Sequence, residues 1–368
     1  MLTTERTSHI GNSSFFILHY SFLFLFLFLS CQNKPPQIDV HLGFYHWKTA
    51  LELSPKETNY LDSLQVEKIY IKFFDVDWDF NQQQVKPLAS LQAKTIPSKE
   101  IAIVPTIFIT NRTFQQIEHK HILGLSKQIS AKLKEQFNAF PQHTIQQVQF
   151  DCDWSGTTKE KYFAFLKFMQ QNFLPLGIKL SATIRLHQVK YYDKTGLPPV
   201  DRGLLMFYNM GEVMDFDTKN SILDLALAKK YTTALSDYPL PLDLGLPLFR
   251  WGVLFRHGKM IQLINDLDAT SLVDATRFLK KDLNNYTVLK GTYLDGLYLY
   301  EGDEIRLEAA TMTDLHKAVD LLRPYFINTE FDLLFYHLDE RIIEDFGYKE
   351  LIALAYGLKF EPVILKTQ

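Results

Sequence analysis

The sequence predicts a (β/α)8 TIM barrel, and two features of the chain indicate this fold. Eight short apolar runs lie between Gly43 and Asp339, and helix-like stretches separate most of them. Strands that alternate with helices form parallel sheets, and eight such units over roughly 300 residues suit this barrel. The predicted strands are Gly43–Trp47, Lys68–Trp78, Ile101–Asn111, Val148–Trp154, Ile178–His187, Leu204–Asn209, Leu244–Trp251 and Phe331–Asp339.

Helical spacing of apolar residues recurs between the predicted strands. In Gln116–Phe140, apolar residues return every three or four positions, so they share one face of a helix. Polar residues of the kind that cap helices precede two later stretches. The remaining predicted helices are Thr158–Phe173, Asn220–Tyr231, Asp268–Leu283, Thr313–Tyr325 and Leu351–Leu358.

One segment interrupts the alternation of strands and helices. Residues Gly291–Glu308 alternate apolar and polar side chains around Gly302 and Asp303, which predicts a β-hairpin. The hairpin would be inserted before the helix that precedes the eighth strand. It either forms one wall of the site or packs as an appendage to the barrel.

The N-terminus has the pattern of a targeting signal. Arg6 and His9 precede an apolar run from Phe15 to Leu29, and Ser30 and Cys31 follow. This arrangement resembles a bacterial lipobox, whose cysteine becomes the lipid-bearing N-terminus. An ordinary signal peptide with a chance cysteine is the alternative. We expect a signal in residues 1–31, a polar linker in 32–40 and one barrel domain in 41–368.

Composition limits the partners of this chain. A net charge of −3 does not favour nucleic acid, and lipidation of Cys31 would leave Cys152 without a disulfide partner. The aspartates of 75–79 lack the glycine and closing glutamate of a calcium loop, and no phosphate-binding loop is present. We therefore expect no metal and no cofactor. We also expect a monomer, held by its lipid anchor on the periplasmic face of the bacterial outer membrane.

The polar residues at the predicted strand ends favour a carbohydrate site. The C-terminal ends of barrel strands meet at one mouth, where barrel active sites gather. Aromatic rings stack on the apolar faces of sugars, and carboxylates supply the acid and base for glycosidic cleavage. The candidate substrate-binding residues are Tyr45, Trp47, Asp75, Asp77, Arg185, Tyr208, Asn209, Arg250, Trp251 and Asp339.

The sharpest local pattern is Asp151-Cys152-Asp153 at the end of the fourth predicted strand. Strand alternation places Asp151 and Asp153 on the same side, which faces the barrel mouth. Two carboxylates so close should change each other's pKa. The structural alternative is an aspartate that ends a strand and caps the next helix. Cys152, between them, is expected to be a small buried apolar residue.

This strand resembles the fourth strand of family 18 chitinases, which carry Asp-x-x-Asp-x-Asp-x-Glu. Asp151 and Asp153 match the last two aspartates, and Met206-Phe207-Tyr208-Asn209 is similar to the family's Met-x-Tyr-Asp/Asn. Trp251 would correspond to a tryptophan on the barrel floor. The chain is also similar to bacterial lipoproteins of glycoside-hydrolase type. The resemblance implies a barrel that binds a glycan.

The chain departs from this family at the catalytic acid. Ser155 occupies the position of the family's glutamate, and a hydroxyl does not protonate a glycosidic oxygen as a carboxylic acid does. Another carboxylate would then have to serve, and Glu212 is the first choice because it closely follows Tyr208 and Asn209. Asp75, Asp77 and Asp339 are the other candidates.

The sequence thus predicts a lipid-anchored glycoside-hydrolase-like barrel with Asp153 and Glu212 as the acid/base pair and Asp151 tuning Asp153. Its ligand would be an oligosaccharide or an envelope glycan. The alternative is a lipoprotein that binds a glycan without cutting it, which the replacement of the usual acid by Ser155 suggests.

Overall fold

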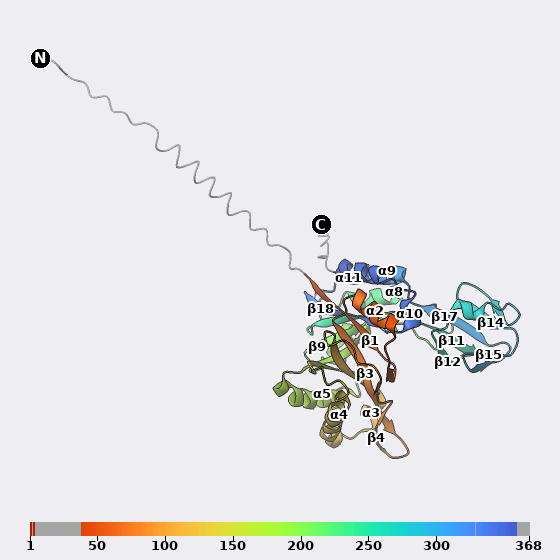
Figure 1. Cartoon of the computed structure of the whole chain (residues 1–368), viewed down its shortest axis with the longest axis horizontal. Helices are drawn as coiled ribbons and strands as arrows, with labels where there is room; N and C mark the ends of the chain where they lie inside the picture. Colours follow the sequence, from red (N-terminus) through yellow and green to blue (C-terminus); the bar gives the residue numbers. More distant parts are fainter. Residues whose placement is uncertain (2, 4–37, 328, 359–368) are drawn as a thin grey trace. The chain divides into compact units, whose positions relative to one another are not determined.

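The computed structural model describes Met1, Thr3, residues 38–327 and residues 329–358 (Figure 1). Apart from Met1 and Thr3, the predicted signal with its Cys31 lies outside these described residues, as do residues 32–37 of the predicted linker. Within the described residues, no helix combines the length and the apolar character that a membrane crossing needs.

Eight parallel strands close into a barrel. Each strand pairs in parallel with its neighbours, and β1 pairs with both the second and the last barrel strand, which closes the ring. This arrangement confirms the predicted (β/α)8 class. The barrel strands are β1 (Asp39–His46), β3 (Lys68–Asp79), β6 (Ala102–Ile109), β7 (Gln147–Asp151), β8 (Lys179–Arg185), β9 (Arg202–Met206), β10 (Leu242–Pro247) and β18 (Glu330–Tyr336).

Helices connect most of the barrel strands, and local sequence signals fix several of their starts. Ser54 accepts a hydrogen bond from the backbone N–H of Glu57, whose side chain bonds back to Ser54 N–H. Asp224 and Thr311 cap two further helices. The α-helices are α2 (Pro55–Ser63), α3 (Asn111–Gln116), α4 (Ile122–Phe137), α5 (Lys159–Phe173), α6 (Leu186–Lys190), α7 (Tyr192–Thr195), α8 (Leu225–Thr232), α9 (Met312–Leu322), α10 (Glu340–Ile343) and α11 (Tyr348–Leu358).

Short elements complete the barrel domain. Strand β4 extends the barrel sheet by pairing antiparallel with the end of β3, and β2 pairs with β5. Single turns of 3-10 helix lie beside longer helices or in loops. These elements are β2 (Ala50–Leu51), β4 (Gln84–Leu88), β5 (Gln92–Ala93), η2 (His119–His121), η3 (Leu174–Leu176) and η4 (Ala269–Leu272).

An antiparallel sheet is inserted between the seventh and eighth barrel strands. Five strands follow the order β12-β11-β17-β14-β13, and β15 pairs with β16 as a separate ribbon (Figure 1). A small apolar core of its own lies under this sheet. Its strands are β11 (Arg250–Arg256), β12 (Lys259–Asn265), β13 (Phe278–Lys280), β14 (Asn285–Val288), β15 (Thr292–Leu294), β16 (Leu297–Leu299) and β17 (Glu304–Ala309).

The insertion differs from the sequence prediction in two ways. The predicted helix 268–283 is wrong, because only one 3-10 turn forms after Asp268 and the following residues enter β13. Gly302 and Asp303 do lie in a turn, but the strands on either side of it pair with different partners. Strand β17 pairs with β11 and β14, whereas β16 pairs with β15 across Asp295 and Gly296.

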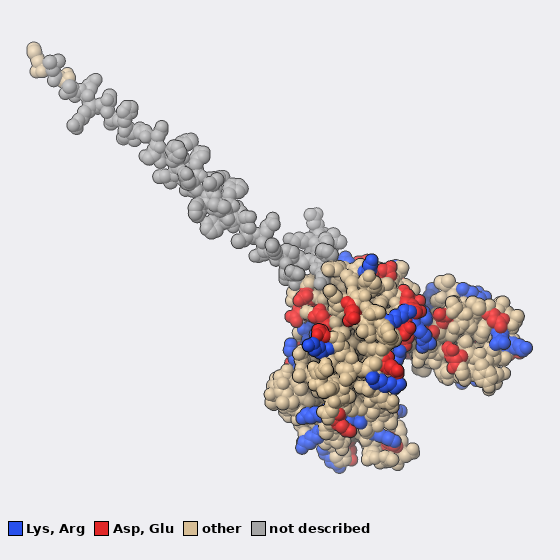
Figure 2. Space-filling model, in the orientation of Figure 1, with Lys and Arg blue, Asp and Glu red and all other residues tan. Residues whose placement is uncertain are grey.

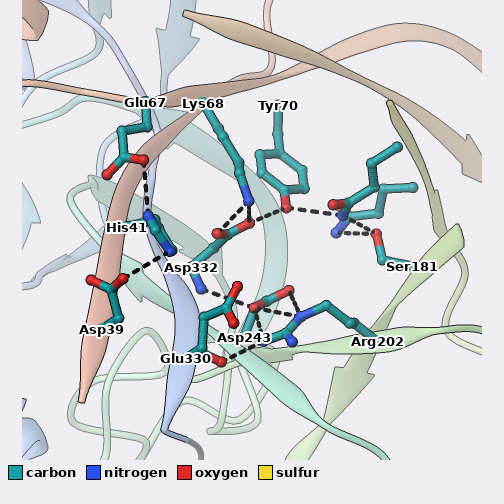
Figure 3. A network of polar contacts seen from close by, with 12 residues as sticks. Asp39, His41, Glu67, Lys68, Tyr70, Ser181, Arg202, Asp243, Glu330 and Asp332 are labelled. Atoms are coloured by element: carbon teal, nitrogen blue, oxygen red, sulfur yellow. Dashed lines mark hydrogen bonds and ion pairs between the residues drawn. The ribbon is translucent and has the colours of Figure 1, made fainter. Parts of the chain in front are cut away.

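Polar residues fill the barrel near the N-terminal ends of its strands (Figure 3). Lys68 Nζ lies 2.6 and 2.8 Å from the two carboxylate oxygens of Asp332, and the Tyr70 hydroxyl donates to the same carboxylate. Arg202 donates to Asp243, whose side chain is almost fully buried. These paired charges close this end of the barrel, so the open mouth lies at the other end.

Charges of both signs are interspersed on the face of the molecule in Figure 2. The barrel core beneath is apolar outside the polar layer, and Cys152 is a buried free cysteine within it, as the sequence predicts.

Candidate functional site

Two neighbouring hollows lie at the C-terminal mouth of the barrel, and both are lined by Asn209 and Trp251. The first, of about 360 Å³, is called the aromatic hollow, and its walls include Trp47, Phe249 and Tyr336. The second, of about 320 Å³, is called the acidic hollow. Its lining residues are Asp153, Arg185, His187, Asn209, Gly211, Glu212, Val213, Ser221 and Trp251.

Asp151 and Asp153 have different surroundings although only one residue separates them. Asp151 ends β7 inside the barrel and accepts a hydrogen bond of 2.6 Å from Thr183 Oγ1. Burial raises the pKa of Asp151, while the Thr183 bond and the nearby Arg185 act in the opposite direction. The Asp153 side chain is 55% exposed and faces the acidic hollow, with its Oδ2 atom 3.9 Å from Arg185 Nε.

Glu212 lies in the loop after β9 and lines the acidic hollow together with Asp153. The inserted sheet holds this loop. Arg306 of β17 donates hydrogen bonds to the carbonyl oxygens of Val213 and Asp215, at 3.1 and 2.8 Å. The fold therefore brings the two predicted acid/base residues to one cavity, although they come from different strands.

Ser155 is engaged in the turn that begins α5. Its hydroxyl lies 2.9 Å from Thr157 Oγ1 and 3.2 Å from Thr158 Oγ1, and its backbone N–H donates to Thr158 Oγ1. Thr158 in turn donates to Asn111. The residue at the position of the chitinase acid thus stabilises local backbone.

Aromatic side chains form the wall of the aromatic hollow. Tyr336 packs against Trp47, Tyr208 and Phe249, with ring centroids 5.3 to 5.8 Å apart. Tyr45 lies beneath these rings, only 1% exposed, and donates a hydrogen bond to Gln149. Tyr208 is also buried, at 2% exposed. Of the predicted aromatics, Trp47 and Trp251 line the hollows, whereas Tyr45 and Tyr208 support them from below.

Three residues that shape the hollows were missing from the sequence prediction. Tyr336 could have been found by the criterion that identified Tyr45 and Trp47, because it is an aromatic residue at the C-terminal end of a barrel strand. Glu308 is buried and accepts hydrogen bonds from Trp251 Nε1 and from the backbone N–H of Ser221, both at 2.9 Å. Arg306 donates to the same carboxylate. Glu308 and Arg306 gave only a weak signal, because charged residues that alternate with apolar ones along a strand usually face solvent.

Several predicted ligand-binding residues have partners within the protein. Asp77 accepts hydrogen bonds from Thr110 and from Arg112, and its pKa is lowered by these bonds against an opposing effect of burial. Asp75 lies 3.2 Å from Lys72 Nζ. These two aspartates lie in the C-terminal part of β3 and are absent from the lining of both hollows.

Asp339 and Arg250 line the aromatic hollow but are also engaged. Asp339 caps α10 through the backbone N–H of Arg341, and its carboxylate lies 2.7 Å from Lys48 Nζ. Arg250 forms ion pairs with Asp266 and Asp345. Its charge is thereby offset by protein carboxylates. No group of three or more potential metal-ligating side chains occurs among the described residues.

Comparisons with known proteins reveal a shared fold. No family model matches the chain, and no curated protein matches its sequence. The spore cortex-lytic enzyme SleL of Bacillus cereus aligns over 89% of this chain and 76% of its own, at 14% identity and a TM-score of 0.53.

Two chitinase structures give similar values. A chitinase from Chromobacterium violaceum aligns over 85% of this chain and 99% of its own, at 11% identity and a TM-score of 0.50. The C-terminal domain of a putative chitinase from Desulfitobacterium hafniense aligns over 88% and 99%, at 11% identity and 0.51. The barrel is therefore of the kind found in these family 18-like glycoside hydrolases.

Proposed function

We propose that this protein is a lipid-anchored barrel of glycoside-hydrolase type that binds an oligosaccharide or envelope glycan and cleaves a glycosidic bond. One observation carries the proposal: Asp153 and Glu212 line the same hollow at the barrel mouth, beside Trp251. The shared fold with chitinases and a cortex-lytic enzyme supports the choice of substrate class.

The two hollows would accommodate successive sugars of one chain. Trp47, Tyr336 and Trp251 offer ring faces in the aromatic hollow, and aromatic rings bind the apolar faces of sugars. Asn209 lines both hollows, so a glycan could pass from one to the other without leaving the mouth.

Asp153 and Glu212 would divide the acid and base roles. One protonates the oxygen of the leaving sugar, and the other activates water or attacks the sugar directly. Asp151 lies beside Asp153 at the end of the same strand, and its burial favours the protonated form. Protonation of Asp151 would remove a second negative charge from beside Asp153.

Hydrolysis assays on the full-length protein test this proposal. We expect Asp153→Asn and Glu212→Gln each to lower turnover about 10²- to 10⁴-fold on a chitooligosaccharide or peptidoglycan glycan, because general acids and bases contribute this much. Sugar affinity should remain, since both changes are nearly isosteric.

Matched control variants are available away from the mouth. Asp237→Asn and Glu135→Gln alter exposed carboxylates before β10 and near the end of α4, so both should keep wild-type turnover. Normal turnover in Asp153→Asn would contradict the proposed role of that residue.

A second candidate function is glycan binding without cleavage. The hydrogen bonds of Ser155 to Thr157 and Thr158 favour it, because the position of the chitinase acid serves local structure here. Calorimetry with the same glycans separates the two functions. Binding by the wild type with no product after prolonged incubation would establish this candidate over the hydrolase.

A further inference from the structure

Arg185 differs from every other arginine that the structure describes. The nearest carboxylate oxygen to its guanidinium is Asp153 Oδ2 at 3.9 Å, beyond hydrogen-bond reach. The other eight described arginines each have a carboxylate oxygen within 3.2 Å. They are Arg112, Arg202, Arg250, Arg256, Arg277, Arg306, Arg323 and Arg341.

The fold holds Arg185 firmly at the mouth. Its backbone N–H donates to Gln188 Oε1 at 2.8 Å, and Gln188 Nε2 donates to the carbonyl oxygen of Trp154. Gln188 is fully buried. The backbone of Arg185 is therefore fixed at the end of β8. Its side chain is 25% exposed, and no carboxylate lies within hydrogen-bond distance of its guanidinium N–H donors.

A small side pocket of about 100 Å³ adjoins the acidic hollow and shares Arg185, His187 and Asn209 with it. Its other walls are apolar or aromatic and include Met206 and Tyr231. No carboxylate is among its lining residues, whereas Asp153 and Glu212 line the acidic hollow. An anionic group would be repelled in the acidic hollow and attracted in the side pocket.

The volume of the side pocket limits what it can hold. At about 100 Å³ the pocket has room only for a small substituent. A carboxylate on one to three carbons is of this size. The apolar walls suit the carbons, and a guanidinium binds a carboxylate through two parallel hydrogen bonds. His187 offers a ring nitrogen beside it, and burial lowers its pKa, which keeps the ring neutral near pH 7.

We propose that the side pocket binds a carboxylate carried on a short carbon chain, attached to the sugar that occupies the acidic hollow. The substrate class would then be glycans with acidic substituents rather than neutral glycans. This inference rests on the proposed function and names its preferred substrate.

Calorimetry on the full-length protein with a matched pair of ligands tests the inference. One ligand is a disaccharide of N-acetylglucosamine and N-acetylmuramic acid, which bears a lactyl carboxylate. The other is the same disaccharide with that carboxylate converted to the amide. The wild type should bind the acid about 10- to 100-fold more tightly, because hydrogen bonds to a charged group contribute that much.

Variants of Arg185 locate the effect. Arg185→Gln should weaken binding of the acid to the level of the amide and leave binding of the amide unchanged. Arg277→Gln, which alters an exposed arginine of the inserted sheet, should keep the wild-type preference. Circular dichroism of each variant checks that it is folded.

The outcomes separate this inference from the proposed function. Equal affinity of the wild type for acid and amide would overturn the side pocket as a carboxylate site and leave glycan binding intact. Retention of the preference in folded Arg185→Gln would also overturn it. Failure of both disaccharides and of neutral chitooligosaccharides to bind would overturn the proposed function itself.

Discussion

At the scale of single residues, the site depends on how deeply each titratable side chain is buried. Asp151 and Asp153 belong to one short motif, yet one is enclosed by the barrel and the other faces a hollow. Arg185 and Arg250 are buried to a similar degree and differ in their ion pairing, because only Arg250 has its charge offset by close carboxylates, those of Asp266 and Asp345. Residue type alone therefore does not define a role at the mouth.

His46 shows how burial links pH to stability. It ends β1, is 2% exposed, and its Nδ1 atom has no hydrogen-bond partner among the described residues. Burial, with Lys48 and His337 nearby, lowers the pKa of His46 from 6.5 to about 4. Between those values the unfolded chain binds a proton and the folded chain does not. The stability that neutral His46 contributes is therefore fully present above pH 6.5, and it is lost as the pH falls toward 4.

We expect this histidine to reduce the free energy of unfolding by about 3 kcal/mol between pH 6.5 and pH 4. Urea unfolding of wild type and His46→Gln across this range measures it. The variant should show a shallower loss of stability on acidification, whatever its stability at pH 7. The exposed His316→Gln should keep the wild-type slope. Identical slopes for His46→Gln and wild type would rule out this role.

At the scale of elements, the inserted sheet positions the acidic hollow. Arg306 of β17 holds the loop that carries Glu212, and Glu308 of the same strand holds Trp251 and Ser221. The sheet that begins after the seventh barrel strand thus holds four residues that line the hollow: Glu212, Val213, Ser221 and Trp251. Trp251 of β11 lines both hollows, whereas no residue of the predicted hairpin segment, 291–308, lines either of them.

Close packing of the barrel strands makes one glycine necessary. A Cβ atom at Gly43 of β1 would lie 2.9 Å from the backbone oxygen of Lys68 and would also clash with Leu334. Gly43→Ala should lower the free energy of unfolding by about 1–3 kcal/mol, as overpacked cores do. Urea unfolding of the purified variant gives the value.

Gly124→Ala is the matched control, because nothing lies within 4 Å of the added carbon in α4. Alanine favours helix over glycine, so this variant should be more stable by up to about 1 kcal/mol. Loss of stability in Gly124→Ala, or none in Gly43→Ala, would contradict the packing argument.

At the scale of the whole molecule, the barrel has two chemically different ends. Partly buried ion pairs such as Lys68–Asp332 and Arg202–Asp243 lie at one end of the barrel (Figure 3). The hollows lie at the other end, the C-terminal mouth, where loops and the inserted sheet supply side chains.

The proposed lipid anchor is also a property of the whole molecule. Cys31→Ser should abolish palmitate labelling in a bacterial host and release the protein from the membrane fraction, because the cysteine is the proposed acceptor of the lipid. Cys152→Ser is the matched control, since Cys152 is buried in the barrel and should leave labelling unchanged. Undiminished labelling of Cys31→Ser would show that the segment is an ordinary signal.

The sequence by itself determined the barrel and the end at which its polar residues gather. Apolar runs such as Lys68–Trp78 and Val148–Trp154 are local patterns, and the C-terminal ends of parallel strands must share one mouth. The same rule predicted that Asp153 and Glu212 would lie near each other. Local periodicity and chain topology are sufficient for these conclusions.

Only the tertiary structure decided which polar residues are available to a ligand. Residues 268–283 have helical spacing, yet β13 forms within them because it pairs with β14, which in turn pairs with β17 further along the chain. Likewise, Arg250 lies 95 positions before Asp345, with which it forms an ion pair. Such contacts depend on residues far apart in the chain, and no local pattern records them. The physical reason is that burial and charge pairing are properties of the packed molecule, whereas strand and helix periodicity are properties of a short segment.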